Sequence, residues 1–434
     1  MMKYSVITFG CRVNQADSLA FEEELRVRGA TTAASPDDAD VVIVNTCSVT
    51  SSADQGARQT VRRLARINPE AKVVVTGCYA TRRPDEFGGL TNVLRVVSNG
   101  DKSSVVSRLA ADLGFTTSER FGDGEGSCGA PIEPGVAGRT AFTLRVQTGC
   151  AQPCAYCIIP TTRGAPRSVP LDGILSEVDR IAGAGFKEIA LTGVHLGSYG
   201  RDLNPQSSLV ELLRALTLRV RGVRLQLDLR PDLLFRISSL EPMDCSREIV
   251  DLVAQHNCFA PHFHLPLQHA SDRMLTAMRR PYTFAYYADL VDSIRARVPP
   301  ASIGSDVIVG FPGETDEDFE ELCRFLEQSP LTHVHVFPYS DRPGTVASAM
   351  SGKVHGAVIR ERAARVREIG GRLTMAFRAS QVGTVHRGLT LEDGSLVVTG
   401  NYLKVRIAPG RSRNEWVSVR ITNAGEAGMT GETW

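Results

Sequence analysis

The stretch Cys150-Ala151-Gln152-Pro153-Cys154-Ala155-Tyr156-Cys157 brings three thiols into one short segment with the spacing C-x₃-C-x₂-C. Thiolates at this spacing can hold three irons of a [4Fe–4S] cube, and no fourth cysteine follows at ferredoxin spacing. One iron would then be free to bind a small molecule, as a catalytic cluster requires. The alternatives are buried thiols or a zinc loop, but structural zinc needs four ligands, usually from two cysteine pairs, and no second pair follows.

The composition is that of an ordinary globular protein. The chain has 434 residues, of which 42% are hydrophobic and 22% charged, and this length predicts two or three domains. We find neither a signal-peptide pattern nor a run of about 18 apolar residues, so we expect no membrane span and a cytoplasmic location. Ten cysteines are too few for a disulfide scaffold in a chain of this length, and their grouping favours metal binding.

The net charge of +1 does not by itself indicate a nucleic-acid partner, but the distribution of charge is uneven. Residues 353–378 contain seven Lys or Arg and two Asp or Glu. This run is either a solvated helix face or a surface that follows phosphates.

The first hundred residues alternate between apolar strands and helices. We expect strands at 5–9, 40–45 and 71–76, with helices at 16–28 and 52–66. Continuous β-branched runs that alternate with helices predict an open parallel sheet covered on both faces.

Each of these three strands is followed by a cysteine, namely Cys11, Cys47 and Cys78. The carboxyl ends of parallel strands share one edge of a sheet, where ligands bind, so the three thiols can converge. Single cysteines at such positions are usually buried small side chains. Three at equivalent positions predict a second three-thiolate iron–sulfur site.

A stretch rich in Gly and Pro at 121–138, which contains Cys128, predicts a linker between domains. Beyond it, we expect helices at 171–184 and 316–328 and six strands, at 143–147, 188–192, 224–228, 262–265, 306–310 and 333–337. Six strand–helix units predict a partial relative of the (β/α)₈ barrel, with its active site on loops at the strand carboxyl ends.

The last fifty residues change character. Short strands expected at 384–386, 396–399, 402–406 and 415–419 predict a small antiparallel β-barrel, with basic and aromatic residues suited to nucleic acid. The predicted fold class is therefore α/β with a C-terminal β-barrel. The expected domains are residues 1–120, a linker at 121–138, residues 139–370 and residues 371–434.

These motifs together resemble the radical S-adenosylmethionine (SAM) methylthiotransferases over essentially the whole chain. The matching segments are 10–18, 45–47 and 76–78 around the first cysteine set, 150–160 with 163–164 around the second, and the C-terminal segment, which resembles a TRAM domain. The resemblance implies that Cys150, Cys154 and Cys157 hold the cluster that cleaves SAM to a 5′-deoxyadenosyl radical. It implies that the cluster on Cys11, Cys47 and Cys78 carries the sulfur that, once methylated, replaces a hydrogen of the substrate.

The resemblance also implies residues that bind SAM. Tyr156 would pack beside the adenine, and Gly193, with Gly197, would allow the backbone to approach the SAM amino group. Glu241 lies in a matching motif at 237–242, and Gly310 and Gly313 lie in a turn expected near the adenine. Ordinary turns are the alternative for these glycines.

Several other residues have open roles. Arg230 and Arg236 are candidates for pairing with a carboxylate or phosphate. His262, His264 and His269 could suggest a metal site, and we favour pocket lining instead. Cys128, Cys245, Cys258 and Cys323 have no matching partners and are expected to be structural.

The segment at 10–15, Gly-Cys-Arg-Val-Asn-Gln, resembles the branch that modifies N6-threonylcarbamoyladenosine in tRNA. The alternatives are the branch that modifies isopentenyladenosine in tRNA and the branch that modifies an aspartate of a ribosomal protein. The implied partners are tRNA and an electron donor such as flavodoxin or ferredoxin, while the sulfur donor stays open. Two further hypotheses assign a different activity. The chain could be an RNA-binding protein whose clusters are not catalytic, or it could be a radical-SAM methyltransferase. A methyltransferase would not need the first cysteine set.

Overall fold

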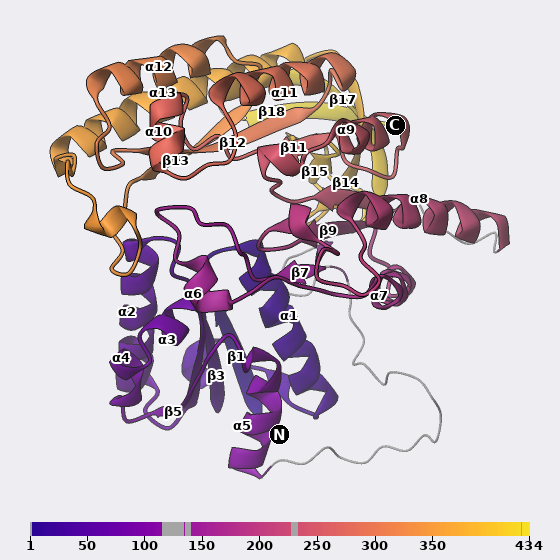
Figure 1. The fold of residues 1–434 in the computed structure, drawn as a ribbon. Helices are drawn as coiled ribbons and strands as arrows, with labels where there is room; N and C mark the ends of the chain where they lie inside the picture. The colour runs from indigo at the N-terminus through magenta and orange to yellow at the C-terminus, as the bar shows by residue number, and fades with distance from the viewer. Residues whose placement is uncertain (1, 115–133, 135–139, 227–232, 427) are drawn as a thin grey trace. The chain divides into compact units, whose positions relative to one another are not determined.

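The computed structural model describes residues 2–114, 134, 140–226, 233–426 and 428–434 (Figure 1). It divides into two compact units. The first contains residues up to 132 with 148–152 and 157–166, and the second contains 133–147, 153–156 and 167–434. Cys128 and Arg230 lie outside the described residues, as does the predicted linker apart from Pro134.

The first unit contains a five-stranded parallel sheet in the order β2-β1-β3-β4-β5. Its strands are β1 (Lys3–Thr8), β2 (Thr31–Thr32), β3 (Val41–Thr46), β4 (Lys72–Gly77) and β5 (Val93–Val97). The helices of this unit are α1 (Arg12–Val27), α2 (Ser51–Ile67), α3 (Cys78–Arg82), α4 (Asp85–Gly88), α5 (Val105–Leu113) and α6 (Ile159–Arg163).

Helices cover both faces of this sheet, as the continuous apolar strands predict (Figure 1). Val42 and Val44 of β3 point to one face, where they pack with side chains of α2 and α3. Ile43, between them, packs on the other face with side chains of α1 and α5. The alternation along one strand therefore fills two cores, and the predicted open α/β sheet is confirmed.

The second unit contains six parallel strands in two three-stranded sheets, β10-β9-β6 and β11-β12-β13. A single parallel bridge between Phe235 of β10 and Phe259, just before β11, connects the two sheets. The strands are β6 (Ala141–Arg145), β9 (Glu188–Thr192), β10 (Leu234–Ile237), β11 (His262–His264), β12 (Ser302–Val309) and β13 (His333–Pro338). This arrangement agrees with the predicted six-stranded partial barrel.

Helices alternate with these strands along the chain. They are α7 (Leu171–Gly183), α8 (Leu209–Gln226), α9 (Arg247–Gln255), α10 (Asp272–Ala277), α11 (Phe284–Arg297), α12 (Asp316–Gln328) and α13 (Gly356–Ser380). A short pair of strands, β7 (Gln147–Thr148) and β8 (Arg167–Ser168), flanks the cysteine loop. Among the described residues, no helix is both long and apolar enough to cross a bilayer.

The strand expected at 224–228 is wrong. Residues 224–226 end α8, residues 227 and 228 lie outside the described part, and the third barrel strand is β10. Leu209, Leu212, Leu213 and Leu216 recur at helical spacing and are all buried, so the helix extends into the start of the short β-like run.

The chain ends in a closed five-stranded barrel in the order β14-β15-β16-β18-β17. Its strands are β14 (Val385–Leu391), β15 (Leu396–Thr399), β16 (Lys404–Arg406), β17 (Trp416–Gly425) and β18 (Gly428–Thr433). The sequence prediction missed β18, in which Gly428 and Gly431 interrupt the strand pattern, since glycine is depleted in strands. It also missed that β16 and β18 pair in parallel, so the barrel is not wholly antiparallel.

Candidate functional site

The first cysteine set lies at the carboxyl ends of three neighbouring parallel strands. Cys11 follows β1 and caps α1, Cys47 directly follows β3, and Cys78 follows β4 as the first residue of α3. Since β1, β3 and β4 are adjacent in the sheet, the expectation that these residues share one edge is confirmed.

The thiols of this set are close enough to interact. The Sγ of Cys47 accepts hydrogen bonds from the backbone N–H groups of Cys11 and Val49, the latter at 3.4 Å. A Cβ on Gly10 would lie 2.2 Å from the same sulfur, so only glycine leaves room for the thiol. Burial, followed by the neighbouring Cys11 and Cys78, raises the pKa of Cys47 to about 11. Cys47 therefore lies close enough to both other thiols for the three to share a cation or cluster.

A buried charge cluster lies beside Cys78. The carboxylate of Asp17 pairs with Lys102 at 2.7 Å and with Arg163 of α6 at 3.4 Å, and all three side chains are at most 7% exposed. The Oδ1 of Asn14 accepts from both cations, at 3.2 Å from Lys102 and 2.5 Å from Arg163. Arg163 also donates to the sulfur of Cys78.

The charges in this cluster do not balance. When all three groups are ionised, two cations and one carboxylate leave one buried positive charge next to the thiols. Burial opposes the charged form of Arg163, but Cys78 and Asp17 outweigh burial and raise the pKa of its guanidinium. Burial lowers the pKa of Lys102, and Asp17 opposes this shift. Because a buried charge without a partner is costly, the surplus fits an anion held by the three cysteines, such as a thiolate-bound iron–sulfur cluster.

The second cysteine loop is divided between the two units. Cys150 and Cys157 belong to the first unit, and Cys154 belongs to the second. The sulfurs of Cys150 and Cys157 accept the backbone N–H groups of Gln152 and Ile159, at 3.4 and 3.5 Å. N–H groups directed at sulfur favour the thiolate, which is the form that binds iron.

Within the second unit, Arg280 connects Cys154 to two of the predicted SAM-binding residues. Its Nη1 lies 3.1 Å from the sulfur of Cys154 and 3.4 Å from the hydroxyl of Tyr156, and its Nη2 pairs with Glu241. Burial opposes the charge of Arg280, but Tyr156 and Glu241 outweigh burial and raise its pKa. Sequence reasoning missed this residue because no local pattern separates it from the exposed Arg279 next to it.

The remaining predicted SAM-binding residues follow the carboxyl ends of barrel strands. Gly193 comes directly after β9, where a Cβ would lie 3.0 Å from the Oε1 of Gln147. Gly310 comes directly after β12 at φ 76°, and its N–H donates to Glu314 at 2.7 Å. Gly313, at φ 83°, donates its N–H to Gly352 at 2.8 Å. Positive φ explains glycine at the last two positions without a ligand.

Other residues singled out from the sequence have structural surroundings. Arg236 is fully buried and pairs with Glu188 at 2.8 Å, so its carboxylate partner is internal. His269 is fully buried, and its Nδ1 accepts the N–H of Ser271. Cys245 and Cys323 are buried and Cys258 is partly buried. His262 and His264 lie on the same strand face, as expected, and both approach His333.

The basic run at 353–378 forms most of α13, and much of its charge is neutralised by acidic residues of α12 and the preceding turn. Arg362 pairs with Glu314 and Asp316, while Arg365 pairs with Glu320. Arg372 bonds both Glu327 and Glu368. Three of the seven basic residues of the run are therefore used in packing α13 against α12.

Comparison with known families gives two matches. Residues 3–98 match the family described as uncharacterized protein family UPF0004, and residues 144–326 match the radical SAM superfamily. The two matched segments contain the first and second cysteine sets respectively.

Curated relatives extend over nearly the whole chain. A threonylcarbamoyladenosine tRNA methylthiotransferase MtaB from Aquifex aeolicus is 36% identical over 93% of this chain and 96% of its own length. The protein of the same name from Bacillus subtilis is 33% identical over 92% of this chain and 88% of its own. A tRNA-2-methylthio-N(6)-dimethylallyladenosine synthase from Symbiobacterium thermophilum is 32% identical over 98% and 93%.

Among solved structures, the radical SAM methyltransferase TsrM from Kitasatospora setae matches with a TM-score of 0.51 and 18% identity, over 71% of this chain and 66% of that one. At this identity the match shows a shared fold. Taken with the family models and the near-complete coverage of the curated relatives, it leads to one assignment: the chain belongs to the radical-SAM methylthiotransferase family, in the branch of its MtaB-named members.

Proposed function

We propose that this chain is a tRNA methylthiotransferase that inserts a methylthio group at C2 of N6-threonylcarbamoyladenosine, next to the anticodon at position 37. The assignment of this substrate rests on five relatives named for this reaction. They are 31–36% identical to the chain over 92–99% of its length. The segment at 10–15, which resembles this branch, supports the same choice.

The cofactors of the reaction are SAM and two [4Fe–4S] clusters. We assign one cluster to Cys11, Cys47 and Cys78, where the buried surplus of positive charge fits an anionic thiolate-bound group. We assign the other to Cys150, Cys154 and Cys157 on the basis of their spacing. When bound, these groups supply the radical chemistry that activates a C–H bond and the sulfur that replaces the hydrogen.

The protein side chains have supporting roles in this proposal. Arg280 holds Cys154, Tyr156 and Glu241 in one network, which would orient the SAM-binding residues. Lys102 and Arg163 would balance the charge of the group on the first cysteine set. Gly193, Gly310 and Gly313 keep the loops at the strand ends free of side chains.

The partners follow from the substrate. A tRNA substrate implies a cytoplasmic reaction, and reduction of the SAM-binding cluster calls for a low-potential electron donor such as flavodoxin or ferredoxin. The proposed division of labour assigns sulfur delivery to residues 1–120, radical formation to residues 139–370 and RNA contact to residues 371–434.

The test is mass spectrometry of tRNA nucleosides from cells with and without the protein. We expect loss of 2-methylthio-N6-threonylcarbamoyladenosine and accumulation of the unthiolated nucleoside. Loss of the methylthio-isopentenyl nucleoside would instead assign the sister branch, which the relatives of that name at 29–32% identity make the second candidate. Unchanged tRNA would overturn both and direct the search to ribosomal protein.

The roles of the cysteines are tested separately with the purified enzyme. Cys150→Ala should abolish both SAM cleavage and product. Cys78→Ala should leave SAM cleavage in place but abolish methylthiolation, because only the sulfur-carrying cluster is lost. Full product from Cys78→Ala would indicate a methyltransferase instead.

A further inference from the structure

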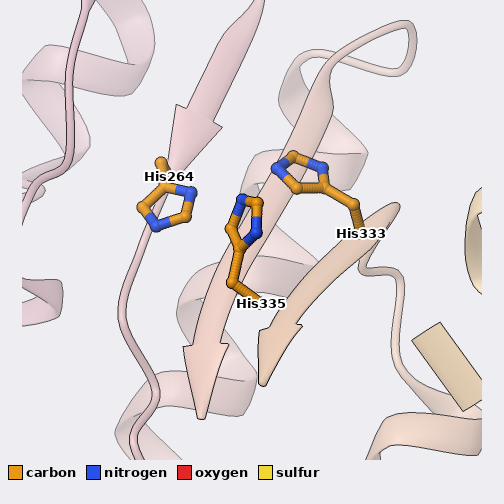
Figure 2. Close-up of side chains that lie close together, drawn as sticks. All are labelled: His264, His333 and His335. Carbon is orange, nitrogen blue, oxygen red and sulfur yellow. The ribbon is translucent and has the colours of Figure 1, made fainter. Parts of the chain in front are cut away.

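Three imidazoles meet on one face of the β11-β12-β13 sheet in the second unit (Figure 2). His264 ends β11, and His333 and His335 lie on β13. One ring nitrogen from each lies within 4.8 Å of one from each of the others. The register of the sheet explains why the three imidazoles lie close together. Gly304 of the middle strand pairs with both His264 and His333, and Asp306 pairs with His335.

The hydrogen bonds of His264 leave one of its nitrogens free to act as a ligand. Its Nε2 lies 2.9 Å from the Oδ1 of Asp306. An ionised carboxylate only accepts hydrogen bonds, so Nε2 carries the proton and Nδ1 keeps its lone pair. Histidines that bind a metal through one ring nitrogen characteristically donate the N–H of the other nitrogen to a carboxylate. The carboxylate fixes the tautomer and the ring orientation.

His333 is oriented in a similar way. Its Nδ1 lies 3.1 Å from the hydroxyl of Thr332, and that hydroxyl donates its one proton to the carbonyl of Ile303, also at 3.1 Å. From this hydrogen-bond pattern we assign the Nδ1 of neutral His333 as the donor, which leaves the lone pair on its Nε2.

Gly304 provides the space for this ring. A Cβ at position 304 would lie 2.0 Å from the Nε2 of His333. Glycine within a strand costs stability and often marks a close approach of another group, here the imidazole. Any other residue at position 304 would block the nitrogen that carries the lone pair.

We propose that His264, His333 and His335 form a site for a divalent transition-metal ion of the Zn²⁺ class, with Asp306 orienting His264 from outside the coordination shell. A tetrahedral zinc with Zn–N bonds of about 2.0–2.1 Å holds its nitrogen ligands roughly 3.4 Å apart, so modest ring rotation closes the site. Three protein ligands leave a fourth position for water or for an anionic oxygen. His335 is exposed, which gives that position access to solvent.

This site is independent of the cysteine sets and differs from the group of His262, His264 and His269 that was considered from the sequence. His264 pairs functionally with two histidines about 70 residues further along the chain, whereas His269 lies buried beside Ser271 and Glu314. Nitrogen ligands suit zinc, cobalt, nickel, copper and iron, and thiolates are absent from the described surroundings of the three rings, so the site differs in class from an iron–sulfur site.

The test measures zinc and iron in the same sample of the full chain, with both clusters reconstituted under anaerobic conditions. The protein is incubated with Zn²⁺ and desalted in the presence of a weak chelator, and both metals are counted by mass spectrometry. We expect one zinc per chain in the wild type and its loss in His335→Asn, with iron unchanged. His355→Asn is the matched control, since His355 is exposed at the start of α13 and lies outside the cluster, and it should retain zinc.

Two further variants test the geometry. Gly304→Ala leaves all three imidazoles in the chain, and its methyl group should displace zinc while iron remains. Asp306→Asn should weaken zinc binding about 10- to 100-fold, as is usual when the carboxylate partner of a ligating histidine is lost. Zinc K-edge absorption of the wild type should report nitrogen and oxygen ligands.

Each other outcome overturns the proposal. If His335→Asn retains as much zinc per chain as the wild type, the zinc is bound by cysteines or by other residues and not by the three histidines. Absence of retained zinc in the wild type means that the three rings only line the barrel. A sulfur-containing shell in the absorption spectrum leads to the same conclusion.

Discussion

Gly10 decides whether the first cysteine set can assemble. Its missing side chain leaves room for the sulfur of Cys47, which a Cβ would approach to 2.2 Å, and its φ of 85° also disfavours other residues. We predict that Gly10→Ala lowers the iron content of the reconstituted protein by about half. Gly29→Ala is the control, because Gly29 has a similar φ of 81° with nothing within 4 Å of its Cβ position. Equal iron in the two variants would show that the close approach to Cys47 is unimportant.

Asp17 is the single carboxylate between two buried cations. Asp17→Asn would leave Lys102 and Arg163 without their shared carboxylate, and breaking a buried pair in this way typically costs about 3–5 kcal/mol. We predict a clear drop in the melting temperature of the cluster-free chain. Asp37→Asn removes an exposed pair with Arg63 and should change stability by less than about 1 kcal/mol. A matching drop in both variants would contradict the special role of the buried cluster.

Arg280 is expected to matter through its planar donor geometry as well as its charge. Arg280→Lys keeps the charge but cannot bond Cys154, Tyr156 and Glu241 at once. We predict weaker SAM binding, measured by calorimetry on the reconstituted enzyme, by about tenfold or more. Arg279→Lys, at the exposed neighbouring residue, should bind SAM like the wild type.

At the scale of the element, α12 begins with a capping box that also responds to pH. Thr315 accepts the N–H of Asp318, and the Asp318 carboxylate accepts the N–H of Thr315 and pairs with Arg273. Burial opposes ionisation, but Arg273 and Thr315 outweigh burial and lower the pKa of Asp318 well below its usual range. Because the folded-state pKa lies below the unfolded one, this stability is present above about pH 4 and is lost as the pH falls further.

We therefore predict that Asp318→Asn lowers the free energy of unfolding near neutral pH. Below about pH 4, the free energy of unfolding of this variant should fall less steeply with pH than that of the wild type. Thr315→Ala, which removes one cap, should cost about 1 kcal/mol. Chemical unfolding between pH 3 and 7 measures both effects. An unchanged acid limb in Asp318→Asn would show that other carboxylates control acid unfolding.

At the scale of the whole molecule, the question is which basic residues are left for tRNA. Three of the six arginines of α13 are paired with acidic residues, and Lys404 and Arg406 of the C-terminal barrel are both exposed. We predict that the double variant Lys404→Gln with Arg406→Gln weakens tRNA binding. The slope of log affinity against log salt should fall by about one for each phosphate that the variant no longer neutralises. Arg365→Gln, which removes an arginine paired with Glu320, should leave the slope unchanged, and the reverse pattern would assign RNA binding to α13.

The sequence by itself determined whatever depends on local order along the chain. Thiol spacing within eight residues indicated the SAM-cluster loop, and runs of Val and Ile after turns indicated the strands whose ends present Cys11, Cys47 and Cys78. Binary patterns of this kind report which face of an element is buried, because the removal of apolar side chains from water is the main driving force of folding. The pattern failed at 224–228, where a β-like run ends a helix that buries Leu209, Leu212, Leu213 and Leu216.

Only the tertiary structure decided which distant residues meet. Asp17, Lys102 and Arg163 are far apart in the chain, yet they form one buried charge cluster. His264 joins His333 and His335 through strand register across β12, and Arg280 reaches Cys154 from 126 residues away. Such contacts depend on which strands are neighbours and on their register, and no local propensity encodes either of them. The spacing of the cysteines, on which their proposed chemistry rests, is therefore a property of the sequence, while the charge cluster and the meeting of the three imidazoles were set by the fold.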